Sequence, residues 1–81
     1  MKQYDLVRLL TNKYAADDEE TRKKMRYYDD PSKNLVKGSI GVIVEDYVEG
    51  YFLVEFPDPD SIYNCDIATV SVRRDEVELA E

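Results

Sequence analysis

Two apolar stretches with a period of two constrain the fold of this chain more than any other feature of its sequence. In Ile40–Val44 and again in Tyr51–Phe56, successive side chains alternate in the pattern typical of β-strands. The connection at residues 47–50 is short enough to join the two strands as an antiparallel hairpin. We expect the core face of the second strand to be the one that carries phenylalanine. That face comprises Phe52, Val54 and Phe56.

Three further segments have the character of strands, and together with the hairpin they predict a single, mainly β domain over residues 1–81. Tyr4–Leu10 is short and apolar without a break, although one helical turn is an alternative for so few residues. Ile67–Val72 alternates and is rich in β-branched residues. The residues at 73–76 predict a single turn before a short last strand at Val77–Leu79. A chain of 81 residues has room for one domain with a modest core.

Glycine and proline positions indicate where the backbone turns. Gly38 precedes the first strand of the hairpin and is expected in a turn. Gly41 interrupts a strand, where glycine usually marks the close approach of another backbone. Pro57 and Pro59 lack backbone donors, so residues 57–60 are expected to form a rigid turn that ends the hairpin.

The long connection at residues 11–34 is predicted to contain a helix. Residues 16–28 begin with acids and end with bases, which matches the sign of the helix macrodipole at each end. Asp17 is the expected N-cap, and Pro31 is expected to end the segment. Acid-base pairs four residues apart should each add ~0.2–0.5 kcal/mol, but so short a helix still needs a surface to lie on. These pairs are Asp18 with Arg22, Glu19 with Lys23 and Glu20 with Lys24.

The whole chain has a formal net charge of −7, and the negative charge is concentrated in its C-terminal half. Residues 1–34 hold eight Lys or Arg against seven Asp or Glu, whereas residues 35–81 hold three against eleven. An acidic surface repels phosphate backbones and attracts basic partners. We therefore expect a basic protein partner, and at most weak binding of nucleic acid. The acids expected to contact this partner are Glu45, Glu49, Glu55, Asp58 and Asp60.

The residue types that most enzymes and metal sites need are missing. The chain has no histidine, which is the usual general base near neutral pH and the commonest metal ligand. Cys65 has no imidazole partner and is expected in a loop, so we interpret it as structural or incidental. Asp58, Asp60 and Asp66 lack the glycine and terminal glutamate of a calcium loop. We expect no catalytic activity, no cofactor and no metal.

The sequence also favours a cytoplasmic location. No apolar run approaches the roughly 20 residues needed to cross a bilayer. Asp5 and Arg8 lie where a signal peptide would be uninterrupted. The single cysteine excludes an internal disulfide and fits a reducing compartment.

Two groups of apolar or aromatic side chains are further candidates for the partner contact. If the phenylalanine face points inward, the strip formed by Ile43, Tyr51 and Leu53 should face outward. The alternative is that the helix of the long connection covers this strip. A set of tyrosines is the second candidate, since tyrosine is enriched at interfaces; the alternative is that they pack the long connection. The set comprises Tyr14, Tyr27, Tyr28 and Tyr63.

Four short motifs between Val36 and Leu79 carry a family resemblance. They are Lys37-Gly38-x-x-Gly41-x-Ile43-Val44, Tyr51-x-x-Val54-Glu55-Phe56, Thr69–Val72 and Val77-Glu78-Leu79. With Tyr4–Leu10 as the opening strand, this run resembles SH3-like barrels and, more closely, a family of small bacterial domains of unknown function. The resemblance implies a five-stranded SH3-like barrel with a helical insert at residues 11–34, between strands 1 and 2. The first motif also resembles KOW modules, which bind RNA.

The resemblance implies functions as well as a fold. The resemblance implies that genes for such domains often neighbour genes for toxin-like proteins. This neighbourhood in turn implies an antitoxin or immunity role. The insert occupies the position of the RT loop of SH3 barrels, which commonly contacts ligands. We therefore expect an acidic interaction module that occludes a basic partner. The alternatives are a structural subunit of a larger assembly, or an RNA or ribosome binder that uses the basic cluster Arg22, Lys23, Lys24 and Arg26.

Overall fold

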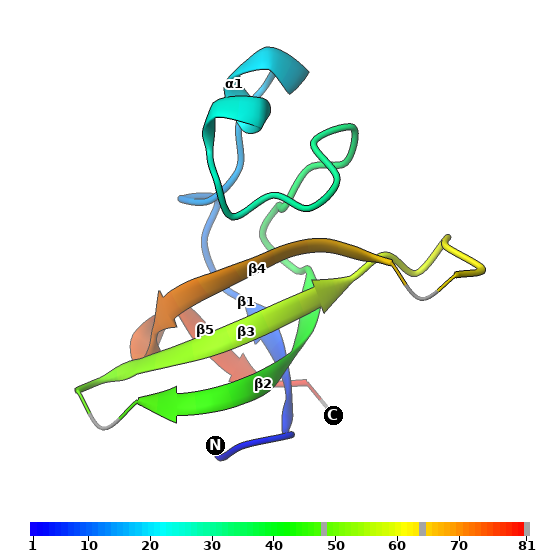
Figure 1. Ribbon diagram of the computed structural model, residues 1–81. Helices are drawn as coiled ribbons and strands as arrows, with labels where there is room; N and C mark the ends of the chain where they lie inside the picture. The colour runs from blue at the N-terminus through cyan, green and yellow to red at the C-terminus, as the bar shows by residue number, and fades with distance from the viewer. Residues whose placement is uncertain (48, 64, 81) are drawn as a thin grey trace.

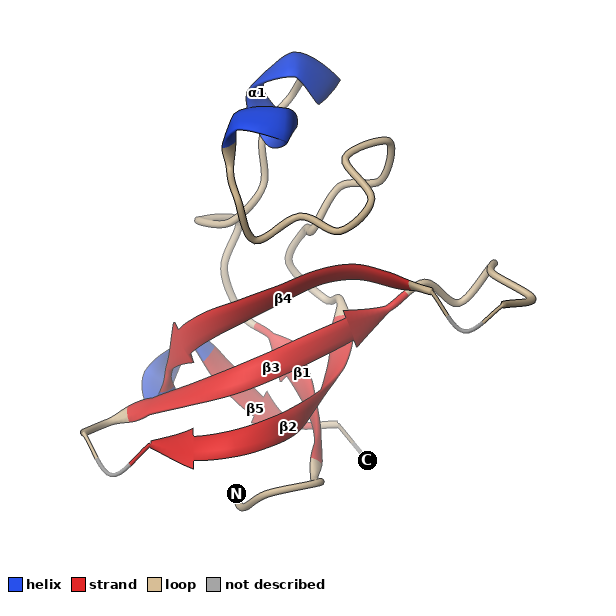
Figure 2. Ribbon diagram, viewed as in Figure 1, coloured by secondary structure: helices blue, strands red, loops and turns tan. Residues whose placement is uncertain are grey.

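The protein folds as one antiparallel sheet of five strands (Figure 1). The computed structural model describes residues 1–47, 49–63 and 65–80; Val48 and Asn64, both in predicted loops, and Glu81 lie outside the described residues. The elements are β1 (Leu6–Leu9), α1 (Glu19–Lys24), β2 (Ile40–Tyr47), β3 (Tyr51–Pro57), β4 (Asp66–Arg73), the 3-10 turn η1 (Arg74–Glu76) and β5 (Val77–Leu79). All five predicted strands are present, so the mainly β class is confirmed. Helix content is small (Figure 2), and no helix in the described part of the chain is long and apolar enough to cross a membrane.

The order of strands shows that the sheet is strongly curled. Neighbours are antiparallel in the order β4-β3-β2-β1-β5, so β4 and β5 form the two edges. Only the three residues of η1 separate these edges along the chain. In a flat sheet, four strand spacings would hold the edges at least about 19 Å apart. Three residues of 3-10 helix span about 6 Å, so the sheet must bend its edges toward each other.

Inward side chains from all five strands form the core on the concave face of the sheet. Phe52, Val54 and Phe56 are fully buried, which confirms the predicted core face of β3. Burial of each such side chain contributes about 1.5–3 kcal/mol, so β3 is a major source of stability. The other strand residues of the core are Val7, Leu9, Ile43, Ala68, Val70, Val72 and Val77. The connection between β1 and β2 adds Tyr14, Tyr28 and Leu35.

A β-bulge in β2 breaks the alternation that the sequence suggested. Ile43 is fully buried and pairs with Val54, but the next pair along the two strands is Glu45 with Leu53. The register shift leaves Val44 as an extra residue, and such an insertion changes which face the following side chains occupy. The prediction that Ile43 faces outward is therefore wrong, because it assumed unbroken alternation from Ile43 to Glu45.

Gly41 lies where β2 passes close to β3. A Cβ atom at this position would come within 2.6 Å of Val54 Cγ1 and 2.8 Å of the Glu55 carbonyl oxygen. Separations this short are essentially never found for real Cβ atoms, so a larger residue needs the strands to move apart. The prediction that Gly41 marks a close backbone approach is confirmed.

The helix of the connection is shorter than the sequence predicted. α1 has six residues, and the next residue, Met25, is already extended. The N-cap is Asp18 rather than Asp17, because the Asp18 carboxylate accepts a hydrogen bond of 2.7 Å from the Thr21 N–H. The prediction of helix through residue 28 is wrong: Met25 and Tyr27 pack against the core, and this packing wins over a helical preference that is marginal alone.

Arg22 stabilises the connection from inside instead of pairing with Asp18. Its side chain is only 9% exposed. Its Nε donates to the Pro31 carbonyl and its Nη1 to the Ala16 carbonyl, both at 2.7 Å. These bonds tie the two ends of the helical segment together. Among the described residues, the predicted pair of Glu19 with Lys23 forms at 3.5 Å, but those of Asp18 with Arg22 and Glu20 with Lys24 do not.

The end of the connection runs along the edge of β4. The Thr69 N–H donates to the Tyr27 carbonyl at 3.0 Å. The N–H groups of Asp29 and Asp30 both donate to the Ile67 carbonyl, at 2.9 and 3.0 Å. An open strand edge is a template for pairing with other chains, so this segment protects β4. It also fixes two acidic residues beside the start of β4.

Candidate functional site

Ion pairs neutralise many of the acids, but not a group where the connection meets β3 and β4. The ion pairs within the described residues join Lys2 to Asp5, Arg8 to Glu78, Lys13 to Glu76, Lys23 to Glu19 and Glu20, Lys33 to Asp58 and Asp60, Arg73 to Asp75, and Arg74 to Asp46. None of these pairs includes Asp29, Glu55 or Asp66. The ion pairs of the described residues therefore give these three carboxylates no basic partner.

Strand pairing and one side-chain hydrogen bond bring these carboxylates together. Glu55 of β3 lies opposite Thr69 of β4. The Thr69 hydroxyl donates to Asp29 Oδ2 at 3.2 Å. Burial raises the pKa of Glu55 above its ordinary value, and the negative charges of Asp66 and Asp29 raise it further. A positive group placed here would relieve this repulsion.

An open hollow of about 610 Å³ lies over the same junction. Its lining consists of Asp29, Asp30, Cys65, Asp66 and Thr69, and we call it the acidic hollow. The Ser32 hydroxyl donates to Asp30 Oδ1 at 2.6 Å, and this bond lowers the pKa of Asp30. The carboxylate therefore stays ionised in the hollow. Within the described residues, no group of three or more His, Cys, Asp or Glu side chains has an arrangement that could hold a metal ion.

The five acids predicted to contact a partner do not form one patch. Glu49 lies in the turn between β2 and β3, and Glu45 of β2 lies opposite Leu53 of β3; both acids are exposed. Asp58 and Asp60 follow the opposite end of β3. The seven residues of β3 hold Glu49 roughly 20 Å from Asp58 at about 3.3 Å per residue, and Glu45, opposite Leu53, lies nearer to Asp58. Glu55 lies between the two groups, on the outer face of the sheet.

Two of the predicted contact residues are buried, and a third is partly buried. Ile43 is fully buried, and Tyr28 is only 8% exposed. The Tyr28 hydroxyl donates to the Tyr14 carbonyl at 2.7 Å and accepts from the Leu35 N–H at 3.0 Å. The Tyr27 hydroxyl also donates to the Tyr14 carbonyl, at 3.1 Å. Packing of the connection, which was the alternative interpretation, therefore accounts for Tyr28 and for most of Tyr27.

The remaining aromatic and apolar candidates lie at the surface. Tyr51 is 39% exposed, and Leu53 beside it on the outer face of β3 is half-buried. Tyr63, in the loop between β3 and β4, is 80% exposed. Contact of these residues with a partner stays a prediction.

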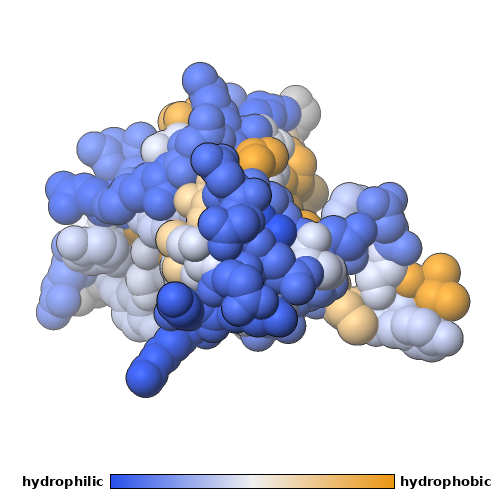
Figure 3. Space-filling model, turned by 90° about the horizontal axis from the view of Figure 1, so that it is seen from above, coloured by the Kyte–Doolittle hydropathy of each residue, from blue (hydrophilic) through white to orange (hydrophobic). Residues whose placement is uncertain are grey.

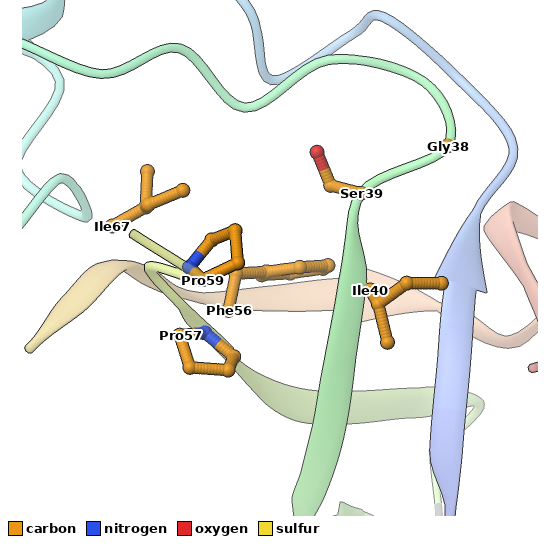
Figure 4. A pocket seen from close by; sticks show the side chains of 7 residues that line it. All are labelled: Gly38, Ser39, Ile40, Phe56, Pro57, Pro59 and Ile67. Carbon is orange, nitrogen blue, oxygen red and sulfur yellow. The ribbon is translucent and has the colours of Figure 1, made fainter. Parts of the chain in front are cut away.

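An apolar pocket of about 430 Å³ opens at the end of the sheet, between the start of β2 and the end of β3. It is lined by Gly38, Ser39, Ile40, Phe56, Pro57, Pro59 and Ile67, and we call it the apolar pocket. In Figure 4 the two prolines and Ile67 lie on one side, Ile40 and Ser39 lie on the other, and the Phe56 ring lies between them. The pocket and the acidic hollow share the junction of β3 and β4, since Ile67 lines one and its neighbour Asp66 lines the other.

The loop between β3 and β4 carries the most exposed large apolar side chains of the described residues. Ile62 is 84% exposed and Tyr63 is 80% exposed. Seen from above, this loop projects from the body of the molecule and is hydrophobic near its end, whereas most of the surface in that view is hydrophilic (Figure 3). Pro59 of the apolar pocket belongs to the same loop, three residues before Ile62.

Cys65 lies in this loop, as the sequence suggested, directly before β4. Its N–H donates to the Ser61 hydroxyl at 3.3 Å, and its carbonyl accepts from the Asp58 N–H at 2.9 Å. Both bonds involve the backbone of Cys65, while the residue itself is exposed and lines the acidic hollow.

Sequence reasoning missed the apolar pocket and the acidic hollow. The Pro57-Asp58-Pro59-Asp60 segment was a usable signal for such a site, because apolar and acidic side chains alternate along this rigid turn. No pattern in the sequence places Ile40 beside Ile67, or Asp29 beside Glu55. Those contacts depend on strand register and on the path of the connection.

The chain matches a known protein family but no individual protein. No curated protein and no solved structure matches it. A family model described as a domain of unknown function (DUF4926) matches residues 27–78, from the segment beside β4 into β5. This match covers more than half of the chain and confirms the resemblance to a small family of domains of unknown function. The protein therefore belongs to the DUF4926 family.

Proposed function

We propose that this protein is an acidic interaction module with the architecture of an SH3-like barrel, and that it binds a basic surface of another protein. The observation that carries the proposal is the group of carboxylates at Asp29, Glu55 and Asp66. They lie together outside the ion pairs of the described residues, and burial and mutual repulsion raise the pKa of Glu55. Basic side chains of a partner would lower the free energy of this arrangement.

Three features support the SH3-like barrel. The sheet has five strands, and its two edge strands are joined by a single 3-10 turn. A small barrel also needs a strongly curled sheet, so the curl that this turn requires supports the proposed barrel. The long connection lies between β1 and β2, the position of the RT loop.

Occlusion is the mechanism that this architecture favours. The chain supplies a charged surface and no histidine, so it would act by covering a basic surface of the partner. Masking a basic surface is what an antitoxin or immunity protein would do to a basic toxin. The resemblance described above points to the same role, which therefore forms part of the proposal.

RNA binding through the basic cluster is the weaker candidate. Arg22 is buried and donates to two backbone carbonyls, so its charge is not presented at the surface. Lys23 pairs with Glu19 and Glu20 at 3.5 and 3.4 Å. Two of the four basic residues in the cluster are thus engaged within the chain. Sub-micromolar RNA affinity at physiological salt, measured by fluorescence polarisation, would favour the RNA candidate instead.

Affinity capture followed by binding kinetics tests the proposal. The full chain and the triple variant Asp29→Asn, Glu55→Gln, Asp66→Asn are used to capture proteins from the native host. The captured protein is then purified, and its association rate with each form is measured at about 50 mM and about 500 mM salt. We expect a basic partner whose association is at least ~10-fold slower with the variant at low salt, because long-range charge acts on encounter.

A matched control removes the same charge elsewhere. The variant Glu19→Gln, Glu20→Gln, Asp75→Asn loses three carboxylates that form ion pairs away from the junction. It should associate at close to the wild-type rate. Equal slowing by both variants would mean that net charge alone acts, and association that is independent of salt would contradict the proposal.

A further inference from the structure

We propose that the apolar pocket and the acidic hollow together bind one extended segment of the partner, which places an aliphatic side chain in the pocket and a lysine or arginine over the hollow. This inference deepens the proposed function and rests on it.

The shape and lining of the pocket favour an aliphatic side chain. Its volume of about 430 Å³ lies within the range of ligand-binding pockets. Small-molecule sites usually add a few free polar groups that fix the orientation of the ligand. Here the Ser39 hydroxyl already donates to the Val36 carbonyl at 2.7 Å, and the Gly38 N–H donates to the Leu9 carbonyl at 2.8 Å. The pocket therefore selects mainly by apolar shape.

Charge at the border of the pocket favours a basic neighbour for that side chain. Asp58 and Asp60 alternate with the two prolines that line the pocket. On the side of β4, Ile67 of the pocket follows Asp66 of the acidic hollow. The border of the pocket thus carries the exposed carboxylate of Asp60 on the side of the prolines, and Asp66 is the chain neighbour of Ile67 on the side of β4. A segment in which lysine or arginine flanks the aliphatic residue complements this border.

Lys33 occupies part of this border and acts as an internal substitute for the partner's basic group. Its Nζ lies 3.8 Å from Asp58 Oδ2 and 3.7 Å from Asp60 Oδ2. Both distances are long for an ion pair; the Asp58 side chain is only 9% exposed, whereas the Lys33 and Asp60 side chains are 39% and 82% exposed. An exposed pair such as Lys33 with Asp60 is weak, so a basic residue of the partner can replace Lys33 beside Asp60. Removal of the lysine charge should therefore strengthen binding.

The pocket is ready to bind without a large rearrangement. The rings of Pro57 and Pro59 fix two backbone φ angles in its wall. The Asp58 N–H donates to the Cys65 carbonyl at 2.9 Å, and Asp58 Oδ1 accepts from the Asp60 N–H at 2.9 Å. These bonds hold the turn in one conformation, which reduces the entropy lost on binding.

An NMR titration of the ¹⁵N-labelled full chain tests the inference with two synthetic peptides. The first has a central leucine flanked by two lysines on each side, and the second has serine in place of the leucine. We expect the leucine peptide to shift the amide signals of Ile40 and Ile67 and to bind about 10-fold more tightly than the serine peptide, from burial of one aliphatic side chain. The comparison uses only the wild-type chain, so it does not depend on how any variant folds.

Matched variants then locate the contact. Ile40→Ser should reduce the affinity for the leucine peptide to that of the serine peptide, whereas Leu79→Ser, at a similarly exposed aliphatic residue of β5, should leave it unchanged. Asp60→Asn should weaken the affinity for both peptides by about 2-fold to 5-fold, which corresponds to the loss of one exposed ion pair. Asp75→Asn, at a carboxylate of similar exposure in η1, should not. Lys33→Gln should increase the affinity for both peptides.

The outcomes separate this inference from the proposed function. Equal affinity for the two peptides, with shifts confined to residues of the acidic hollow, would overturn the pocket assignment and leave the basic-partner function standing. If neither peptide binds and an RNA oligonucleotide does, the proposed function fails as well. Unchanged affinity in Lys33→Gln, together with unchanged affinity in Asp60→Asn, would exclude the border charges from the contact.

Discussion

The Tyr14 hydroxyl donates a hydrogen bond of 2.5 Å to Glu76 Oε1, although 62 residues separate them in the chain. The same carboxylate accepts from the Arg73 N–H at 2.7 Å and pairs with Lys13 Nζ at 3.3 Å. It therefore joins the connection after β1 to the turn before β5. Burial alone would raise the pKa of Glu76, but its bonds to Tyr14, Arg73 and Lys13 outweigh burial and hold the pKa below its ordinary value.

Loss of the Tyr14 hydroxyl should lower stability in a way that depends on pH. We expect Tyr14→Phe to reduce the free energy of unfolding at neutral pH by about 1.5–3 kcal/mol, the range for hydrogen bonds to charged groups. Because the folded pKa of Glu76 is lowered, its stabilisation is present above the unfolded value of about 4.3 and is lost as pH falls through the folded pKa. Urea unfolding at about pH 7 and about pH 3 should show a smaller difference between the two proteins at the lower pH.

Tyr63→Phe is the control for this experiment, because Tyr63 is 80% exposed. It should leave the free energy of unfolding unchanged at both pH values. An equal loss of stability in Tyr14→Phe at low and neutral pH would show that ring packing, and not the bond to Glu76, accounts for the effect.

The close approach at Gly41 predicts a large loss of stability on enlargement. Gly41→Val places new atoms against Val54 Cγ1 and the Glu55 carbonyl, which can give way only if β2 and β3 separate. Overpacking of this kind costs about 1–3 kcal/mol or more, so we expect the thermal midpoint to fall by about 10 °C. The control is Ser71→Val, at an exposed position of β4, which should shift the midpoint by only a degree or two. An equally small shift in Gly41→Val would contradict the register of β2 and β3.

The charge of Glu55 is predicted to lower stability at neutral pH. Because its folded pKa is raised above the unfolded value, the ionised form is disfavoured by folding, and this cost disappears as pH falls below the unfolded value. Glu55→Gln should therefore raise the free energy of unfolding at pH 7 by up to about 1 kcal/mol and give no gain at about pH 3. Chemical unfolding at the two pH values measures this, with Glu45→Gln, an exposed acid of the same hairpin, as a control that should show no gain.

Cys65 is predicted to be dispensable for folding. The structure uses its backbone N–H and carbonyl, which a serine supplies equally well. We expect Cys65→Ser to keep the wild-type thermal midpoint within about 1 °C, since exposed substitutions usually change stability by less than about 0.5 kcal/mol. A midpoint lower by several degrees in differential scanning calorimetry would show that the thiol itself packs against the fold.

Local patterns predicted the strands but not the faces and edges that depend on pairing. Period-two alternation located β2 and β3, and the buried face of β3 followed from its phenylalanines. The buried face of β2 could not be predicted from the sequence, because the bulge after Ile43 depends on how β2 pairs with β3. The helix was overestimated because its charge pattern is a local signal, whereas the burial of Arg22 and Tyr28 is a tertiary one.

The candidate site shows the same division. The sequence indicated an acidic half and named Glu55, Asp58 and Asp60, all of which lie near the site. It could not bring Asp29 to Glu55, because that contact depends on hydrogen bonds between the connection and β4. The apolar pocket was also missed, since its walls come from segments that meet only in the folded sheet.

The pairing of β5 with β1 has a consequence for how the chain is made. Val7 lies opposite Leu79 and Leu9 opposite Val77, so the first strand to leave the ribosome has one neighbour that is translated among the last. Until residue 79 has emerged, β1 has only β2 beside it, and the apolar side chains of Val7 and Leu9 lack part of their cover. Folding of this domain during synthesis therefore cannot finish before translation has passed β5, and ribosomes stalled before that point should hold a protease-sensitive chain.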